Sequence, residues 1–326
     1  MPETLQEQLV KHLADVHSIE EQALLQMRIA PRMAGDPELA GAFREHITET
    51  EDHERLVRGR LEAQAAEPSK VKDVVARAGG VGMVLFARSQ PDTPGKLVAH
   101  AYSYEHMELA AYELLGIVAR RADDAQTAEV AGSIREQEAA MAGRLAAGFD
   151  RAVDASLRDV TTDDVSKQLG RYLSDAHAIE SQALQLLQQG QAIAGEPDLR
   201  KVFEEHLEET RSQRAAVEAR LAARDERPSR VKDVVLRIGG FNLGGFFGAQ
   251  PDTPAKLAGF AFAFEHLEVA AYEQLVRVAR RTGDDETARL AERILGEERA
   301  AAAALRAQFE PAMEAALAQQ GVTPSG

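Results

Sequence analysis

The sequence is an internal duplication, and this repeat limits how the chain can fold more than any other feature. When the chain is shifted by 160 residues, VKDVVARAGG at Val71–Gly80 aligns with VKDVVLRIGG at Val231–Gly240. YEHMELAAYE at Tyr104–Glu113 aligns in the same way with FEHLEVAAYE at Phe264–Glu273. This period is too long for one unit of a solenoid, so each copy is expected to be a complete domain. Residues that both copies retain while their neighbours differ are candidates for function.

Hydrophobic periodicity predicts four helices in each copy and no strands. In copy one the expected helices are Glu3–Met33, Glu38–Ala65, Pro94–Ala122 and Ala125–Gly148. The first and second helices, and the third and fourth, are joined by short turns, whereas the connection from Glu67 to Thr93 is long. One long crossover in a four-helix domain is typical of ferritin-like bundles. We therefore expect an all-α chain of two tandem ferritin-like four-helix bundles, each with a long crossover between its second and third helices.

The expected boundaries follow from the repeat. Residues 1–150 form copy one, 151–162 a polar linker, 163–318 copy two and 319–326 a loose C-terminal tail. The crossover is expected to contain a short helix at Lys70–Arg77, followed by the glycine-rich apolar stretch GGVGMVLF, which copy two matches with GGFNLGGFFGAQ. Such stretches favour packing across the bundle, and they are also candidates for contacts in a homo-oligomer.

Composition excludes several classes of function. The formal net charge of −15 argues against non-specific nucleic-acid binding, which needs basic patches. The chain has no cysteine, which excludes disulfides, thiol catalysis and Cys-ligated zinc or iron–sulfur sites. The N-terminal segment lacks the pattern of a signal peptide, and no apolar run is long enough to span a membrane. We therefore expect a cytoplasmic protein.

Acidic side chains interrupt the apolar stripes of the expected helices. In the first helix the inward-facing positions include Leu13, Val16, Glu20, Ala23 and Met27, so an acid lies at the centre of an apolar seam. The same pattern recurs on all four helices, and both copies keep the polar residues near the helix midpoints: Glu20/Glu180, His46/His206, Glu49/Glu209, Glu105/Glu265, Glu108/Glu268 and Glu138/Glu298. Because the midpoints of antiparallel helices of similar length lie at one level, these side chains should converge.

The cost of burial decides what such a cluster can be. An unpaired buried carboxylate costs several kcal/mol, and neighbouring anions repel one another. Arginine partners would be one solution, but Arg60/Arg220 and Arg120/Arg280, which both copies keep, lie about three turns from the acids, roughly 16–18 Å along the axis. Divalent cations are the better counter-charge, and oxygen ligands with one or two imidazoles suit iron or manganese. The sequence therefore predicts two iron or manganese ions in each bundle, or in only one of the two bundles.

The histidines and the individual ligand roles are less well defined by the pattern. His53 is replaced by Gln213 in copy two, so it is either a ligand in copy one only or a neutral neighbour of the ligands. His106/His266 is expected to face off the seam, as a neighbour of the ligands or a structural residue. Tyr112/Tyr272 is either a hydrogen-bonding neighbour of the acids or a packing residue, and we favour packing. Glu49/Glu209 and one acid of the third helix would bridge the metals, with Glu20/Glu180 and Glu138/Glu298 as terminal ligands.

The motifs that carry these residues resemble the YciE/YciF-like stress-protein family of the ferritin-like superfamily. The resembling segments are HSIEEQ and HAIESQ, FREHITETEDH and FEEHLEETRSQ, EHMELAAY and EHLEVAAY, and REQE and GEER. The resemblance covers nearly all of both copies and implies a di-metal site and a loose association with stress responses. The chain departs from the Glu-x-x-His pairs usual in ferritin-like sites: His46-x-x-Glu49 has the reverse order, and Met141 or Ala301 stands where a histidine would follow on the fourth helix.

Two kinds of function remain open on the sequence. One is a metal-dependent oxidoreductase, ferroxidase-like or peroxidase-like, whose partners are metal ions and dioxygen or peroxide; the pattern assigns no catalytic residue. The other is a non-catalytic helical scaffold or interaction protein, in which the acids form a polar network or a structural or vestigial ion site.

Overall fold

The structure is a computed structural model that describes residues 4–66, 93–227 and 252–322. Throughout these ranges the regular elements are helices, which confirms the expected all-α class. The chain divides into two compact units, and each is described by itself. Unit 1 comprises residues 1–156 with 317–326, and unit 2 comprises residues 157–316.

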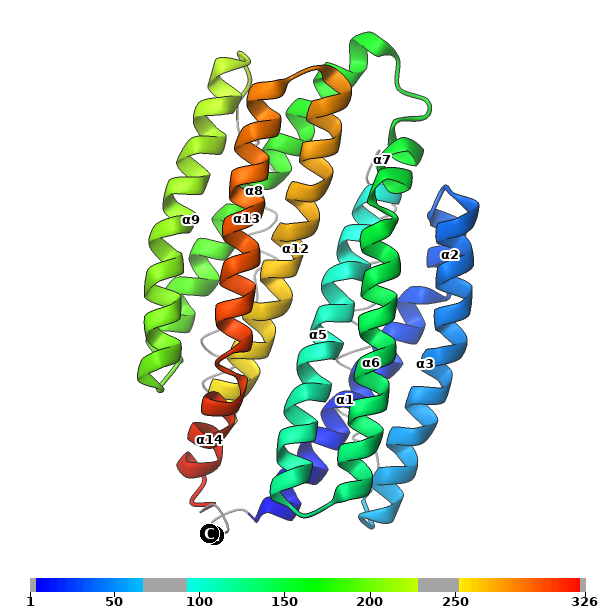
Figure 1. Cartoon of the computed structure of the whole chain (residues 1–326), viewed down its shortest axis with the longest axis vertical. Helices are drawn as coiled ribbons and strands as arrows, with labels where there is room; N and C mark the ends of the chain where they lie inside the picture. Colours follow the sequence, from blue (N-terminus) through cyan, green and yellow to red (C-terminus); the bar gives the residue numbers. More distant parts are fainter. Residues whose placement is uncertain (1–3, 67–92, 228–251, 323–326) are drawn as a thin grey trace. The chain divides into compact units, whose positions relative to one another are not determined.

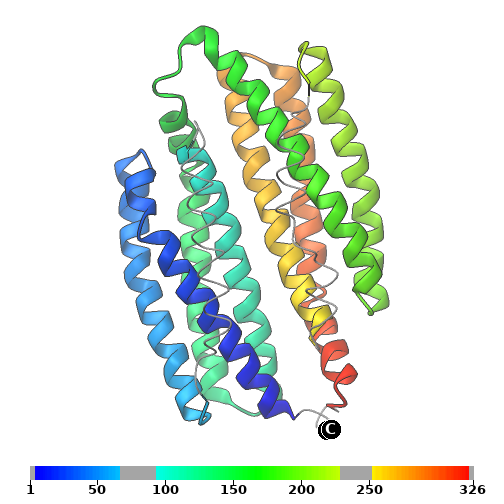
Figure 2. The ribbon, with the colours of Figure 1, turned by 180° about the vertical axis from the view of Figure 1, so that it is seen from behind.

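Unit 1 is built on four long helices that lie side by side (Figures 1 and 2). α1 packs against α3 and α5, and α6 packs against the same two helices, which closes a bundle around one core. Two short helices, α2 and α7, flank the long ones. The bounds are α1 Leu5–Met27, α2 Ala30–Met33, α3 Pro37–Ala63, α5 Thr93–Arg121, α6 Ala125–Ala147 and α7 Phe149–Leu157.

Local sequence signals explain where these helices begin. Thr4 and Glu7 form a capping box at the start of α1, and the side chain of Asp36 accepts hydrogen bonds from the first turn of α3. Asp124 caps α6 in the same way. Gly35, in the turn before α3, has φ +67°, a conformation that favours glycine.

Unit 2 repeats this arrangement. α8 packs against α9 and α12, and α13 packs against the same two helices. The bounds are α8 Thr162–Ile193, α9 Pro197–Ala223, α12 Thr253–Thr282, α13 Asp285–Arg306 and α14 Phe309–Gln319.

Some elements differ from the sequence expectation. The first expected helix is divided in unit 1, where α1 ends at Met27 and Pro31 lies in α2, but it is continuous as α8, in which Gln191 replaces the proline. Much of the expected polar linker 151–162 is helical, because α7 covers residues 149–157 and buries Phe149 and Val153. Most of the expected tail 319–326 lies after α14, which ends at Gln319. The expected helix at Lys70–Arg77 and both glycine-rich stretches lie outside the described residues.

Each bundle is closed at one end by a kept arginine. Arg60 on α3 donates hydrogen bonds to Asp124 and Thr127 at the start of α6, and Arg220 makes the equivalent bonds to Asp284 and Thr287. These arginines therefore have their own partners at the bundle end and are not the counter-charge of the acids at mid-bundle. Over the described ranges, no helix is both long enough and apolar enough to cross a lipid bilayer.

Candidate metal centre

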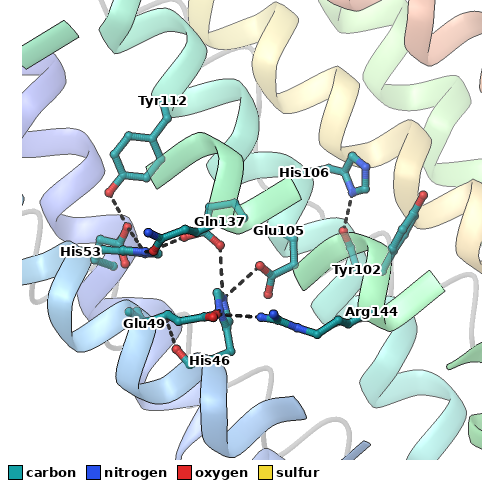
Figure 3. A network of polar contacts seen from close by, with 12 residues as sticks. His46, Glu49, His53, Tyr102, Glu105, His106, Tyr112, Gln137 and Arg144 are labelled. Atoms are coloured by element: carbon teal, nitrogen blue, oxygen red, sulfur yellow. Dashed lines mark hydrogen bonds and ion pairs between the residues drawn. The ribbon is translucent and has the colours of Figure 1, made fainter. Parts of the chain in front are cut away.

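The four long helices of unit 1 bring the predicted polar side chains together at one level of the bundle. α1 supplies Glu20, α3 supplies His46 and His53, α5 supplies Glu105 and Glu108, and α6 supplies Glu138. All of these side chains are buried. Figure 3 shows His46 and His53 on one helix facing Glu105 and Tyr112 on another. In the sequence, these residues were identified as polar side chains that interrupt the apolar stripes of the helices.

The first group consists of His46, Glu105, Glu108 and Glu138, and each offers one ligand atom within 4.8 Å of the others. Nε2 of His46 lies 3.1 Å from Oε2 of Glu105 and 3.2 Å from Oε2 of Glu138. Three carboxylates and one imidazole are a donor set typical of iron or manganese.

A second group lies beside the first and shares a residue with it. It consists of Glu20, His53 and Glu138, whose ligand atoms again lie within 4.8 Å of one another. Nδ1 of His53 is 2.8 Å from Oε1 of Glu138 and 3.7 Å from Oε1 of Glu20. Glu138 thus presents one oxygen to each group.

Burial changes the acid–base properties of the carboxylates. Burial is the main cause that raises the pKa of Glu20 and of Glu105 to about 8, and in both cases the charge of Glu138 adds to it. Burial also raises the pKa of Glu108 well above its usual value. For Glu138 burial acts in the same direction, but hydrogen bonds from His46 and His53 outweigh it and lower the pKa to about 2.

The histidines supply positive charge to this cluster. Burial disfavours the charged imidazole of His46, but Glu105 and Glu138 overcome this and raise its pKa to about 11. The pKa of His53 is also raised, since Glu138 and Glu20 outweigh its burial. Without another cation, protons held on the histidines and acids have to balance the negative charge.

The chemistry of the donors fits a metal ion better than it fits a closed protein network. Both oxygens of Glu108 are buried without a hydrogen-bond partner among the described residues, and so is Oε2 of Glu20. Within the same ranges, the ion pairs of Glu20, Glu105 and Glu138 are with histidine and none is with lysine or arginine. Buried polar groups are normally satisfied, so oxygens that converge without partners indicate room for a cation.

Glu49 lies beside the first group and is not part of it. Its carboxylate accepts a hydrogen bond from Nδ1 of His46 at 2.7 Å and another from Arg144 at 2.7 Å (Figure 3). The side chain remains 31% exposed. Because Glu49 follows His46 by three residues on α3, it folds back onto the far side of the imidazole. The bridging role that the sequence suggested for Glu49 does not fit this placement; Glu138, expected to be a terminal ligand, is the residue shared by both groups.

Unit 2 rebuilds the first group from His206, Glu265, Glu268 and Glu298, again with ligand atoms within 4.8 Å. Nε2 of His206 lies 2.9 Å from Glu265 and 3.4 Å from Glu298. Glu180 is buried as its counterpart is, but Gln213 stands where unit 1 has His53. Glu209 accepts from Nδ1 of His206 at 3.1 Å and is more exposed than Glu49, at 54%.

Two kinds of neighbour complete the site: tyrosines, for which the sequence favoured packing over hydrogen bonding, and Gln137, which the sequence did not indicate. The hydroxyl of Tyr112 donates a hydrogen bond to Glu20, and that of Tyr272 donates to Glu180, so packing alone does not describe these residues. The amide oxygen of Gln137 lies 2.6 Å from Nε2 of His53. The tyrosines are kept in both copies one turn from Glu108 or Glu268, and that spacing was the available signal. His106 lies off the cluster, as expected, with Nδ1 at 2.7 Å from the carbonyl oxygen of Tyr102.

A small pocket reaches the first group of unit 1 from the side of α1, α2 and α5. Its volume is about 40 Å³, enough for more than one water-sized molecule. The wall is mostly apolar and includes Met27 and Met33, while Gln26, His100, Tyr104 and Glu105 supply polar atoms. Burial lowers the pKa of His100 to about 4, so its imidazole is neutral near pH 7. Glu105, a candidate ligand, forms part of the pocket wall.

Comparison with known proteins agrees with the duplication. No solved structure matches the chain. One family model matches twice, over residues 4–158 and 165–318, and its description is "Domain of unknown function (DUF892)". The two matches cover almost the whole chain, one for each copy. The chain therefore belongs to the DUF892 family and contains two tandem copies of its domain.

Proposed function

We propose that this chain is a ferritin-like metal–carboxylate protein, and that unit 1 binds a pair of iron or manganese ions that reacts with dioxygen or peroxide. One observation carries the proposal: Glu108 and Glu138 are buried at a point where acids and histidines from all four long helices converge, and no lysine or arginine among the described residues pairs with them. Such a cluster is stable only with a compensating cation or with several bound protons.

The candidate ligands of unit 1 would form two adjacent metal sites. His46, Glu105 and Glu108 would hold one ion, Glu20 and His53 the other, and Glu138 would serve both. When bound, iron or manganese supplies the electrons that reduce dioxygen or peroxide. Glu49 orients His46 by accepting a hydrogen bond from Nδ1, which leaves Nε2 facing the acids. The hydroxyl of Tyr112 donates a hydrogen bond to one oxygen of Glu20.

The pocket supports a small substrate. A volume of about 40 Å³ has room for a molecule the size of dioxygen or peroxide. The pocket lies next to Glu105, which would bring such a molecule to the ion held by the first group. Protection against oxidative stress fits this reaction and the resemblance to the YciE/YciF-like proteins.

Metal analysis tests the proposal directly. Protein purified without added metal, or reconstituted with Fe(II) or Mn(II), should contain tightly bound ions, and Glu138→Ala should remove most of those in unit 1. Glu136→Ala is the matched control, because Glu136 is exposed on the same helix two residues earlier. Aerobic addition of Fe(II) should give the absorption of protein-bound Fe(III) in the wild type and the control. Protein that binds neither metal would overturn the proposal.

A further inference from the structure

The two units differ at the second group, and this difference has a consequence for metal content that rests on the proposed function. In unit 1 the second group contains the imidazole of His53, next to Glu20 and Glu138. At the same position unit 2 has the amide of Gln213, and the counterparts of Glu20 and Glu138 there are Glu180 and Glu298. The first group, in contrast, has the same residue types in both units.

The exchange of His53 for Gln213 is accompanied by an exchange of its partner. In unit 1 the outer nitrogen of His53 lies 2.6 Å from Oε1 of Gln137, which leaves Nδ1 facing Glu138 at 2.8 Å. In unit 2 the position of Gln137 is taken by Glu297, and Nε2 of Gln213 donates to its carboxylate at 3.0 Å. The neutral amide of Gln213 is thus held by an acid outside the cluster.

This pair of changes removes the strongest neutral ligand from the second group. Imidazole is the commonest metal ligand in proteins and suits iron, for which a neutral amide oxygen is a weaker donor. Of the three residues of the second group, unit 2 keeps the two acids, Glu180 and Glu298, and Glu298 already belongs to the first group.

The surroundings of the cluster also differ. Three polar residues that line the pocket of unit 1 are Gln26, His100 and Tyr104. Their counterparts in unit 2 are Leu186, Phe260 and Phe264. Unit 2 therefore has apolar side chains at three positions where unit 1 has polar residues along the pocket.

We propose that the duplication has produced unequal metal sites: unit 1 binds a pair of ions, and unit 2 binds a single ion at His206, Glu265, Glu268 and Glu298. The pair in unit 1 is the reacting centre, and the ion of unit 2 stabilises its bundle. Counting two groups in unit 1 and one in unit 2, the chain holds three ions.

Reciprocal exchanges at the differing position test the count in the full chain. Apo protein is titrated with Mn(II), and bound ions are counted by elemental analysis after removal of the free metal. The wild type should bind three ions, His53→Gln two, Gln213→His four, and the double variant three. Each substitution introduces the side chain that the other unit carries naturally at that position, and thermal melting of the apo proteins checks that the variants fold.

Electron paramagnetic resonance gives a second readout that does not depend on activity. The wild type should show both an exchange-coupled manganese pair and an isolated ion with resolved hyperfine lines. His53→Gln should lose the coupled signal, and Gln213→His should convert the isolated ion into a second coupled pair. Four ions in the wild type, or an unchanged count in both single variants, would overturn the inequality and leave the proposed function standing. Protein that binds no metal at all would overturn the proposed function itself.

Discussion

Glu108 is the residue whose surroundings make the strongest case for a bound cation. It is buried, neither of its oxygens has a hydrogen-bond partner within the described part of the chain, and burial raises its pKa. Burying a polar group that has no hydrogen-bond partner costs roughly 1–3 kcal/mol, and an apolar side chain of similar size avoids this cost. In the metal-free protein, Glu108→Leu should therefore raise the free energy of unfolding while it lowers metal affinity in unit 1.

Denaturant unfolding and metal titration of the same samples measure both effects. Glu129→Leu, at an exposed position on α6, is the control and should change neither quantity appreciably. A large loss of apo stability in Glu108→Leu would mean that the carboxylate has a stabilising partner in the protein, which contradicts the interpretation of this site.

Glu20 makes the stability of the metal-free protein depend on pH. Its pKa is about 8 in the folded chain, raised mainly by burial, against a usual value of 4.5. Between these two values the folded state holds a proton that the unfolded state has released, so the free energy of unfolding should fall as pH rises from about 4.5 to 8. Glu20→Gln keeps an acceptor for Tyr112 and removes the titration, so its stability should fall less steeply over that window.

Melting curves of apo wild type and Glu20→Gln at several pH values provide this comparison, and Glu21→Gln on the same helix is the control. Equal slopes in Glu20→Gln and the wild type would show that Glu20 does not carry a raised pKa.

Glu49 acts on the site through His46. It accepts a hydrogen bond from Nδ1 and is itself held by Arg144. Loss of such an orienting partner typically weakens metal binding 10–100-fold. Glu49→Ala should therefore weaken binding in unit 1 by about that factor without changing the number of ions bound at saturation. Titration calorimetry gives both quantities, and a loss of one whole site would identify Glu49 as a ligand instead.

The sequence predicted which residues lie at the centre of the bundle better than it predicted what each does there. Glu20, Glu105, Glu108 and Glu138 are inward because they interrupt apolar stripes, and helical periodicity shows this directly. The outward position of Glu49 depends on its side chain bending back toward His46 and Arg144. The bond from Tyr112 to Glu20 depends on how two helices pack, and periodicity within one helix contains no such information.

At the scale of the elements, the pocket between α1, α2 and α5 connects the fold to the proposed reaction. Ala101 lines it on α5, one turn before Glu105. Ala101→Leu adds three carbon atoms to the wall and should slow the oxidation of bound Fe(II) by dioxygen or peroxide about tenfold or more, because a partly blocked pocket limits access.

Stopped-flow absorption after mixing with each oxidant measures this rate, while elemental analysis shows whether metal content is unchanged. Ala111→Leu, farther along α5 and not part of the pocket, is the control. An unchanged rate in Ala101→Leu would show that the oxidant reaches the metals by another path.

Hydrophobic periodicity predicted the helices better than it predicted where they end. α3 and α6 begin close to the expected residues because Asp36 and Asp124 carry recognisable caps. The division between α1 and α2 was missed, although Pro31 was a signal for it, because the apolar pattern continues past the break. α7 was read as a linker because a nine-residue helix with four buried positions is too short for its pattern to stand out from a polar segment.

For the whole molecule, metal binding should increase the free energy of unfolding. Ions that bind the folded chain and not the unfolded one stabilise it by about 2.7 kcal/mol per site at a free concentration of 100 times Kd. Adding Mn(II) or Fe(II) to the apo protein should therefore raise Tm, and a chelator should reverse the change. Mg(II), which prefers oxygen ligands and retains its waters, should have a smaller effect and serves as the control.

The most direct test of the central claim is a crystal structure of the full chain grown with Mn(II), with anomalous difference density collected for manganese. Peaks are expected inside unit 1, on both sides of the Glu138 carboxylate and within ligand distance of His46 and His53. A further peak is expected in unit 2 between His206 and Glu298. A map without manganese at these positions, in which the buried acids instead share protons or meet only ordered water, would contradict it.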